Sequence, residues 1–549
     1  MTGVAAVPVW RSPAPWILLA AFVLVWFASI GIHPPMDPDE GRYGEIPREM
    51  YVTGDWVTPR LNELKYFEKP PLQYWATAAF YHLAGVSIAS SRLWAVTTGC
   101  LGVLLMAALA LRLWDRRTAL LAAAVQAGAL LYALIGHINL LDMGFAFCLQ
   151  LALAGMLLLL DVSGPRRQRA GTWLLAVGVA LAFLSKGLAG VLIPGAVGFI
   201  YLLVSGDWKL LLRARPWLVV LVLAVAAGPW IYAVSRRNPE FMHFFFVHEH
   251  FDRFLTRVHA RYQPPTYFLP VLAVGFMPWT PLLPTMAADA WRAWRAGERV
   301  TQLLVIWVGF VFLFFSFSQS KLIPYILPIV PALALLAGRA LHAREGRAVV
   351  TLATAAGGWL LLAAGSTVAL NWPEGGEILR GRAGEAAAWI VAALWLVGVL
   401  TAASAIVARY GRPQVAVCSA AFATMVFAAA LLWAAQWIPN RLDQNLLIHE
   451  AHDHLTDRTR LFCVDLYLQA APFEFRRPCQ LVRYRGELDF GLSQEPWKWT
   501  ADLPQFVRDW SAQQDAIAFM PPATYAALKQ MDLPMAQVHK RPSLIVITR

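Results

Sequence analysis

MDPDEGRYGEIPREM, residues 36–50, directly follows the apolar run 14–32. Three acids, Asp37, Asp39 and Glu40, crowd into the four positions 37–40, just past a stretch long enough to cross a bilayer. We therefore expect them at the boundary between membrane and water, where carboxylates are costly to keep unless they do chemistry. The apolar run 14–32 is long for a signal peptide, and no small-residue cleavage site precedes the acids. We therefore interpret it as an uncleaved first transmembrane span.

Composition indicates that the chain as a whole is a polytopic membrane protein. Of its 549 residues 58% are hydrophobic and only 15% charged, and the mean hydropathy is +0.52. The formal net charge of +12 would suit nucleic acid, but the basic residues fall in short loops between apolar runs instead of forming a continuous stripe. Such a distribution is typical of orientation signals, so we expect no nucleic acid partner.

The apolar runs predict about thirteen transmembrane helices. Their centres fall near residues 24, 102, 127, 152, 178, 196, 225, 275, 309, 332, 360, 397 and 425. With the N-terminus inside, every predicted inner loop is basic. A wrong number of spans would place some of these basic loops on the outer side. The outer side then receives residues 33–89, the loop 137–142, residues 235–265, the segment 318–321 and everything after 438. In a bacterial inner membrane that side is the periplasm, and in a eukaryote it is the ER lumen.

Two domains are expected. Residues 1–438 form the membrane domain, whose first outer loop, 33–89, carries amphipathic helices at the membrane surface. Residues 439–549 form a small α/β domain outside the membrane, with strands at 461–467, 480–484, 516–520 and 544–548 and helices at 446–455 and 523–531. Cys463 and Cys479 lie in this domain, and a disulfide between them would be worth roughly 3 kcal/mol if unstrained.

The outer face holds the acids that are hardest to explain structurally. Asp39 and Glu40 are adjacent and repel each other at the end of a span, so a pair there is suited to hold a cationic substrate group or to act as a base. Asp142 lies at the same surface, in a loop too short to be filled with solvent, and its structural alternative is a helix N-cap. For Glu45 and Glu49 we expect a supporting or surface role.

Basic residues on that face suit an anionic headgroup such as a lipid phosphate. They are Arg42, Lys69, Arg253 and Lys321. Lys321 lies between two strongly apolar spans, where snorkelling to the interface is its alternative role.

His248 and His250 are two positions apart, so a strand would place both on one face. Glu68 or Glu249 would complete a nitrogen and oxygen ligand set that suits zinc. The alternative is a pair of ordinary hydrogen-bonded histidines.

At these residues the chain resembles the polyprenyl-phosphate-dependent membrane glycosyltransferases of the GT-C class, and among them the lipid A 4-amino-4-deoxy-L-arabinose transferases. The similar segments follow one another in order over residues 1–340. They are DPDEGRY at 37–43, REM at 48–50 with GDW at 54–56, YFEKPP at 66–71, Asp142, Glu249-His250, Arg253-Phe254 and SKLIPYILP at 320–328.

The resemblance implies a GT-C membrane fold and an inverting glycosyltransferase with its site facing the periplasm. It implies Asp39 at the reaction centre with Asp142 as a second acid, a donor phosphate near Arg42, Lys69 and Tyr325, and a zinc site made by Glu68 with His248 or His250. The donor would be a sugar on undecaprenyl phosphate, with no nucleotide, and the acceptor lipid A or lipopolysaccharide in the inner membrane. Such a modification would lower the negative charge of the outer membrane and promote polymyxin resistance. We expect a monomer surrounded by membrane lipids.

Two alternatives remain open at this point. Another GT-C enzyme would use a hydroxyl acceptor on a protein or glycan, and a real general base would then be needed. A flippase for lipid-linked sugars would favour ionisable residues at mid-span and paired broken helices. Here the charge gathers on one outer surface, and no internal repeat is visible.

Overall fold

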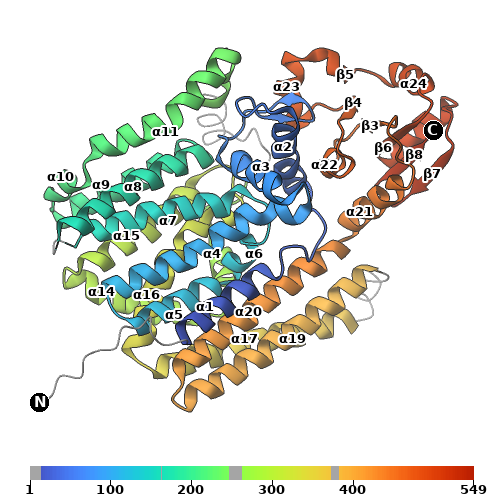
Figure 1. The fold of residues 1–549 in the computed structure, drawn as a ribbon. Coiled ribbons are helices and arrows are strands. Elements are labelled where there is room, and N and C mark those ends of the chain that lie inside the picture. Colours follow the sequence, from blue (N-terminus) through green and yellow to red (C-terminus); the bar gives the residue numbers. More distant parts are fainter. Residues whose placement is uncertain (1–13, 162–163, 247–261, 372–381) are drawn as a thin grey trace, which may run out of the picture.

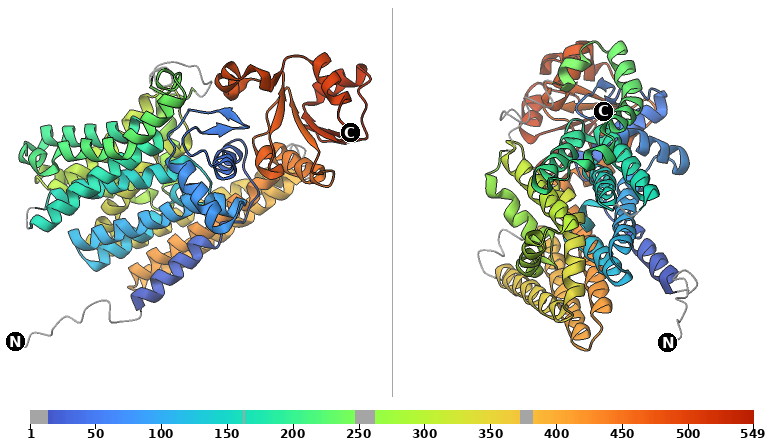
Figure 2. Two further views of the ribbon diagram at one scale, coloured as in Figure 1. Left: turned by 45° about the horizontal axis from the view of Figure 1, so that its top comes forward. Right: turned by 90° about the vertical axis from the view of Figure 1, so that its left-hand side faces the viewer.

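Long apolar helices run side by side through most of the chain, and a small β-sheet lies beyond one end of them (Figures 1 and 2). The structure is a computed structural model that describes residues 14–161, 164–246, 262–371 and 382–549. Within these ranges nine helices are long and apolar enough to cross a membrane, and a bent pair, 265–275 with 280–295, turns through 110°.

All the predicted span centres fall in helices. The nine spans contain α4 (Ile88–Leu113), α7 (Leu141–Leu159), α8 (Pro165–Lys186), α11 (Pro216–Arg237), α15 (Arg299–Phe317), α16 (Val330–Ala343), α17 (Gly346–Asn371), α19 (Arg382–Arg409) and α20 (Pro413–Ala434). The other centres fall in α1 (Ala14–Phe27), α5 (Arg116–Ala127), α9 (Ala189–Ser205) and α13 (Phe268–Gly275), which continues through the bend into α14 (Leu283–Arg295). Since these helices are short, the count of about thirteen spans stays a prediction.

Small residues let α7 and α8 approach closely. A Cβ added to Gly155 would lie 2.4 Å from the backbone nitrogen of Leu175, and one on Gly178 would lie 2.5 Å from that of Ala152. Such contacts are typical of helix pairs in membranes. Because the two helices are antiparallel, the first turn of α7 meets the last turn of α8.

The first outer loop folds into α2 (Asp39–Thr53), the hairpin β1 (Arg60–Leu61) and β2 (Leu64–Lys65), and α3 (Leu72–Ala84). Amphipathic helices at the membrane surface are predicted for this segment, but α2 is buried throughout residues 40–50. The reason is the C-terminal domain, which covers the helix. A Cβ on Gly41 would lie 2.5 Å from the backbone carbon of Gln469, so only glycine allows this approach.

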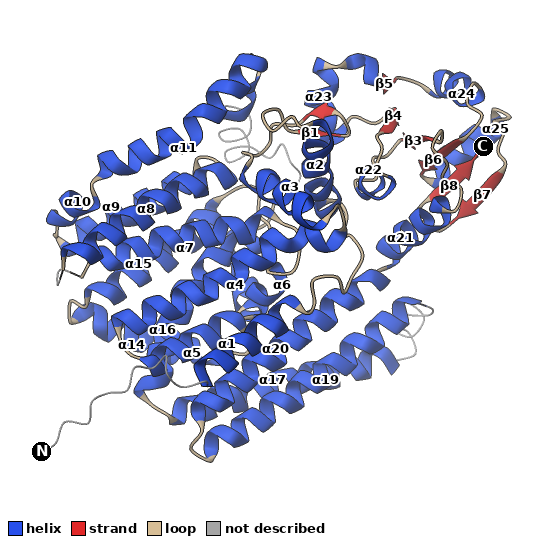
Figure 3. Cartoon of the chain, in the orientation of Figure 1, coloured by secondary structure: helices blue, strands red, loops and turns tan. Residues whose placement is uncertain are grey.

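The C-terminal domain begins with α21 (Pro439–His452) and contains a six-stranded sheet (Figure 3). The strand order is β5-β4-β3-β6-β8-β7. The four strands β5, β4, β3 and β6 are parallel, and β8 is antiparallel to both of its neighbours, β6 and β7. Strands β3 (Arg460–Val464), β4 (Cys479–Val482), β6 (Ala516–Met520) and β8 (Ile545–Thr548) overlap the four predicted strands, whereas β5 (Trp499–Thr500) and β7 (Gln537–Lys540) were not predicted.

One face of this sheet shares a hydrophobic core with the first outer loop. Leu461 and Phe519 of the sheet belong to the same buried cluster as Tyr43, Ile46 and Tyr66. The other face is covered by α24 (Leu503–Ser511) and α25 (Pro522–Gln530), through a separate cluster. The C-terminal domain therefore helps to position α2.

Cys463 and Cys479 lie on the neighbouring parallel strands β3 and β4. Both side chains are buried, and their sulfur atoms are in contact. A disulfide between them stays a hypothesis.

Candidate active site

Arg42 is the basic centre of the first outer loop. It lies in the first turns of α2, where its guanidinium is almost fully buried and contacts two carboxylates. One is Asp39, with Nη1 3.5 Å from Oδ1, and the other is Glu487 of the C-terminal domain. The guanidinium also lies 5.8 Å from the ring centre of Tyr43 and 5.9 Å from that of Tyr66. The C-terminal domain thus supplies a charged group to this site.

Asp39 is the more accessible of the two adjacent acids. Its side chain is 40% exposed, while that of Glu40 has no exposed surface. Burial raises the pKa of the nearby Tyr43 hydroxyl, and Arg42, Asp39, Glu68 and Asp142 all act on it electrostatically. Asp39, Arg42, Glu68 and Asp142 therefore all lie within electrostatic reach of Tyr43.

Asp142 pairs with a lysine that we did not include among the predicted site residues. Lys186 Nζ lies 2.5 Å from Asp142 Oδ1, because the close packing of α7 and α8 brings the start of one helix to the end of the other. The ammonium also lies over the Tyr325 ring, 4.7 Å from its centre. Asp142 is in the first turn of α7, but the N-cap residue is Leu140, so the N-cap alternative is wrong.

Lys69 and Glu68 follow β2 and precede α3. Lys69 Nζ donates to the Glu68 carbonyl at 2.6 Å. The Glu68 carboxylate acts electrostatically on Arg42 and Tyr66. This segment therefore lies on the same side as Arg42.

Lys321 is buried and held by backbone oxygens. Its Nζ donates to the Ser318 carbonyl at 2.5 Å and to the Gln263 carbonyl at 2.8 Å, and it lies 5.7 Å from the centre of the Tyr262 ring. These contacts tie together the segments that precede α13 and α16.

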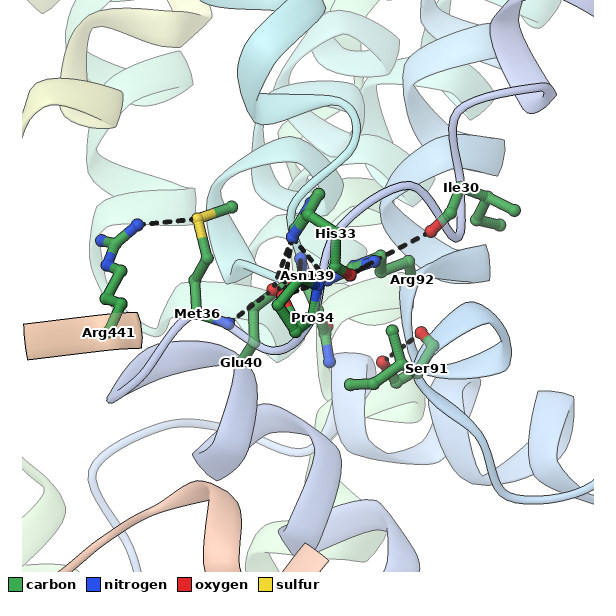
Figure 4. Close-up of polar contacts among 10 residues, drawn as sticks. Ile30, His33, Pro34, Met36, Glu40, Ser91, Arg92, Asn139 and Arg441 are labelled. Carbon is green, nitrogen blue, oxygen red and sulfur yellow. Dashed lines mark hydrogen bonds and ion pairs between the residues drawn. The ribbon is translucent and has the colours of Figure 1, made fainter. Parts of the chain in front are cut away.

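Glu40 belongs to a buried network that joins four parts of the fold (Figure 4). Its Oε1 and Oε2 accept hydrogen bonds from Nε and Nη2 of Arg92, each at 2.8 Å. The backbone amides of Met36 and Asn139 donate to the same carboxylate at 2.9 and 2.8 Å. Burial alone would raise the pKa of Glu40, but Arg92 holds it below the ordinary value. Every Glu40 oxygen is thus engaged away from solvent.

Arg92 completes the network from the second predicted span. It lies on α4, is fully buried, and donates to the backbone carbonyls of Ile30 and His33 at 3.0 and 2.9 Å. The guanidinium therefore fixes the end of the first span against α2 and the loop before α7.

Asp37 is expected to make the stability of the protein depend on pH. Burial raises the pKa of its carboxyl from 3.8 to about 7. Folding therefore favours the protonated carboxyl. Its contribution to the free energy of unfolding is fully present below pH 4 and is lost as the pH rises through 7. We expect the Tm of the wild type to fall relative to that of Asp37→Asn between pH 4 and pH 8. Melting curves recorded across this range check it, and parallel pH profiles would contradict it.

Three predicted site residues, His248, His250 and Arg253, lie outside the described residues. In the ranges that are described, no group of three or more His, Cys, Asp or Glu side chains is placed to hold a metal ion. The zinc site of Glu68 with His248 or His250 stays a prediction.

Two family models match separate parts of the chain. Residues 447–549 match the aminoarabinose transferase C-terminal domain, and residues 16–245 match dolichyl-phosphate-mannose-protein mannosyltransferase. The first match covers the sheet domain that contributes Glu487. The second covers the segments that carry Asp39, Arg42, Asp142 and Lys186.

Full-length relatives and solved structures agree with these matches. The undecaprenyl phosphate-alpha-4-amino-4-deoxy-L-arabinose arabinosyl transferases of Pseudomonas paraeruginosa and Pseudomonas aeruginosa are each 34% identical, over 511 and 520 residues and 91% of both chains. The crystal structure of ArnT from Cupriavidus metallidurans bound to undecaprenyl phosphate superposes with a TM-score of 0.90, at 32% identity and 98% coverage of both chains. Its apo state gives 0.87, at 33% identity, covering 97% of this chain and 98% of that one. The chain therefore belongs to the undecaprenyl phosphate-aminoarabinose arabinosyl transferases, a family of GT-C membrane glycosyltransferases.

Proposed function

We propose that this enzyme transfers 4-amino-4-deoxy-L-arabinose from undecaprenyl phosphate to a phosphate of lipid A, at the periplasmic face of the bacterial inner membrane. The observation that carries the proposal is the gathering of Asp39, Arg42, Asp142 and Lys186 at one end of the bundle, beneath the C-terminal domain. Addition of an amino sugar lowers the negative charge of the outer membrane and thereby promotes resistance to polymyxin. We propose that the enzyme works as a monomer.

The reaction needs positive charge around the departing phosphate. An oxygen of the lipid A phosphate attacks C1 of the sugar, the bond from C1 to the phosphate oxygen of the donor breaks, and undecaprenyl phosphate leaves with that electron pair. Attack from the opposite side inverts the configuration at C1. Arg42, Lys69 and Lys186 supply cations for the departing phosphate, and Tyr325 supplies a hydroxyl. Lys321 and Arg253 are further candidates for binding the donor phosphate.

A phosphate acceptor is already an anion, so a strong general base is not required. Asp39 is free to hold the ammonium group of the sugar or to orient the acceptor, and its exposed carboxylate suits either task. We assign Glu40 a structural role instead of a catalytic one, because its carboxylate has no exposed surface and is fully hydrogen-bonded.

Lys186 and Asp142 are expected to act as one unit. The Asp142 carboxylate holds the ammonium of Lys186 beside Tyr325. Lys186→Ala and Asp142→Asn should each lower kcat roughly tenfold to 100-fold, and the double variant should be little worse than the poorer single variant. Transfer rates of all four proteins measure the coupling. Fully multiplicative losses would show that the two residues act separately.

A zinc ion held by Glu68 with His248 or His250 is a further part of the proposal, and no step above depends on it. Elemental analysis of purified wild type and a His248→Ala/His250→Ala variant tests it. We expect zinc in the wild type and a clear loss in the variant. Equal zinc contents in the two proteins would remove this site.

The test of the function is a transfer assay with purified enzyme and undecaprenyl phosphate-linked aminoarabinose. Lipid A and enzymatically dephosphorylated lipid A serve as matched acceptors, since both carry hydroxyl groups and only the first carries phosphate. We expect transfer to lipid A alone. Equal transfer to both acceptors would favour the hydroxyl acceptor of another GT-C enzyme, and Asp39 would then be the candidate base.

A further inference from the structure

A cavity lined by several arginines lies at the end of the bundle away from the sheet domain. It has a volume of about 370 Å³ and is lined by residues of α14, α15, α16 and the start of α17. Helix α16 leads to it from the active-site end, and α14 lies at the edge of the molecule far from the sheet (Figure 1). Four arginines line this cavity: Arg292, Arg339, Arg344 and Arg347.

Carboxylates hold three of these arginines in place. Asp289 pairs with Arg292 and with Arg347, whose Nη2 lies 3.1 Å from Oδ1. Arg339 Nη1 donates to Glu298 Oε1 at 2.5 Å. Four guanidinium groups thus face two carboxylates, which leaves an excess of two positive charges around the cavity. Arginines that served only to orient the chain in the membrane would not need to be held in fixed positions by carboxylates.

The features of α14 indicate that the cavity lies at the level of the lipid headgroups. Helix α14 follows the bend of 110°, so it does not continue along the direction of α13. Its Trp291 is 61% exposed, and tryptophan prefers the interface between membrane and water. Arg292 is exposed beside it, while Met286 and Leu336 form an apolar part of the cavity wall. A charged rim above an apolar wall matches the two halves of a phospholipid.

We propose that this cavity binds the phosphate-bearing headgroup of an anionic phospholipid of the bilayer. Basic pockets between transmembrane helices commonly bind such headgroups. The excess positive charge selects an anionic lipid over a zwitterionic one, and the apolar wall selects a lipid over free phosphate. The site is separate from the sugar-transfer site and does not depend on the proposed function.

Lipid binding to the delipidated full-length enzyme in detergent tests the proposal. The probes are cardiolipin, phosphatidylglycerol, phosphatidylethanolamine and inorganic phosphate, each titrated while the Tm is recorded. The test variant is Arg292→Ala/Arg344→Ala, because both side chains are exposed and their loss leaves the core intact. The matched control is Arg409→Ala/Arg412→Ala, which removes two exposed arginines that do not line the cavity. Arg292→Lys/Arg344→Lys keeps the charge.

We expect the anionic lipids to raise the Tm of the wild type, the control and the lysine variant. The alanine variant should bind them roughly tenfold or more weakly. Equal binding by the alanine variant and the control would overturn the proposal. So would equal stabilisation by phosphatidylethanolamine, or by inorganic phosphate at the same concentration, since neither outcome requires an anionic lipid.

Discussion

Asp39→Asn is expected to lower the turnover of sugar transfer roughly 100-fold or more, while the protein folds normally. The substitution keeps the shape of the side chain and removes its charge. The Asp39 side chain is 40% exposed, and its contact with Arg42 is long, at 3.5 Å, so the fold depends little on it. In the proposed mechanism this carboxylate holds the amino sugar or the acceptor in line, so the loss should appear mainly in kcat.

Glu63→Gln is the matched control for this measurement. Glu63 is an exposed acid of the same outer loop, and its neutral variant should transfer sugar at the wild-type rate. Transfer from purified undecaprenyl phosphate sugar to lipid A is measured for the three proteins, together with their Tm values. If Asp39→Asn turned over like the wild type at equal stability, Asp39 would have no part in the mechanism.

Arg92→Ala should have the largest effect on stability. It leaves the Glu40 carboxylate buried without the guanidinium that neutralises it, and loss of one partner of a buried ion pair typically costs about 3–5 kcal/mol. It also removes the donors to the carbonyls of Ile30 and His33. We therefore expect a large fall in Tm and poor recovery from the membrane.

Arg112→Ala provides the comparison on the same helix. Arg112 lies in the last turn of α4 and is exposed, so its loss should leave the Tm nearly unchanged. Glu40→Gln should lie between the two. It leaves the Arg92 guanidinium buried without its carboxylate, but Arg92 keeps its hydrogen bonds to the carbonyls of Ile30 and His33. A Tm for Arg92→Ala equal to that of Arg112→Ala would show that the buried network contributes little.

The sequence could locate the active face but could not distinguish its neighbouring residues. Asp39 and Glu40 are adjacent acids with similar chemistry. Successive residues on a helix point about 100° apart, so one is exposed and the other enters the core. Which of them is exposed depends on the position of Arg92, and a lone arginine within an apolar span has no local signal that names its partner.

Lys186 and Glu487 were missed for related reasons. Lys186 ends an apolar helix, where a lysine ordinarily snorkels, and only the packing of α7 on α8 reveals its partner Asp142. Glu487 lies 445 positions from Arg42 in the chain.

In the C-terminal domain, four of the strands were predicted from apolar runs. Strand β7 (Gln537–Lys540) is a partly exposed edge strand with mostly polar residues, so it shows no such run.

An experimental structure of the enzyme with undecaprenyl phosphate bound tests the central claim, which is the position of the donor phosphate. We expect the phosphate oxygens within hydrogen-bonding distance of Arg42, Lys69 or Lys186, with the Asp39 carboxylate facing the place that the sugar would occupy. A phosphate bound at the opposite end of the bundle, or out of reach of all three cations, would contradict the proposed site.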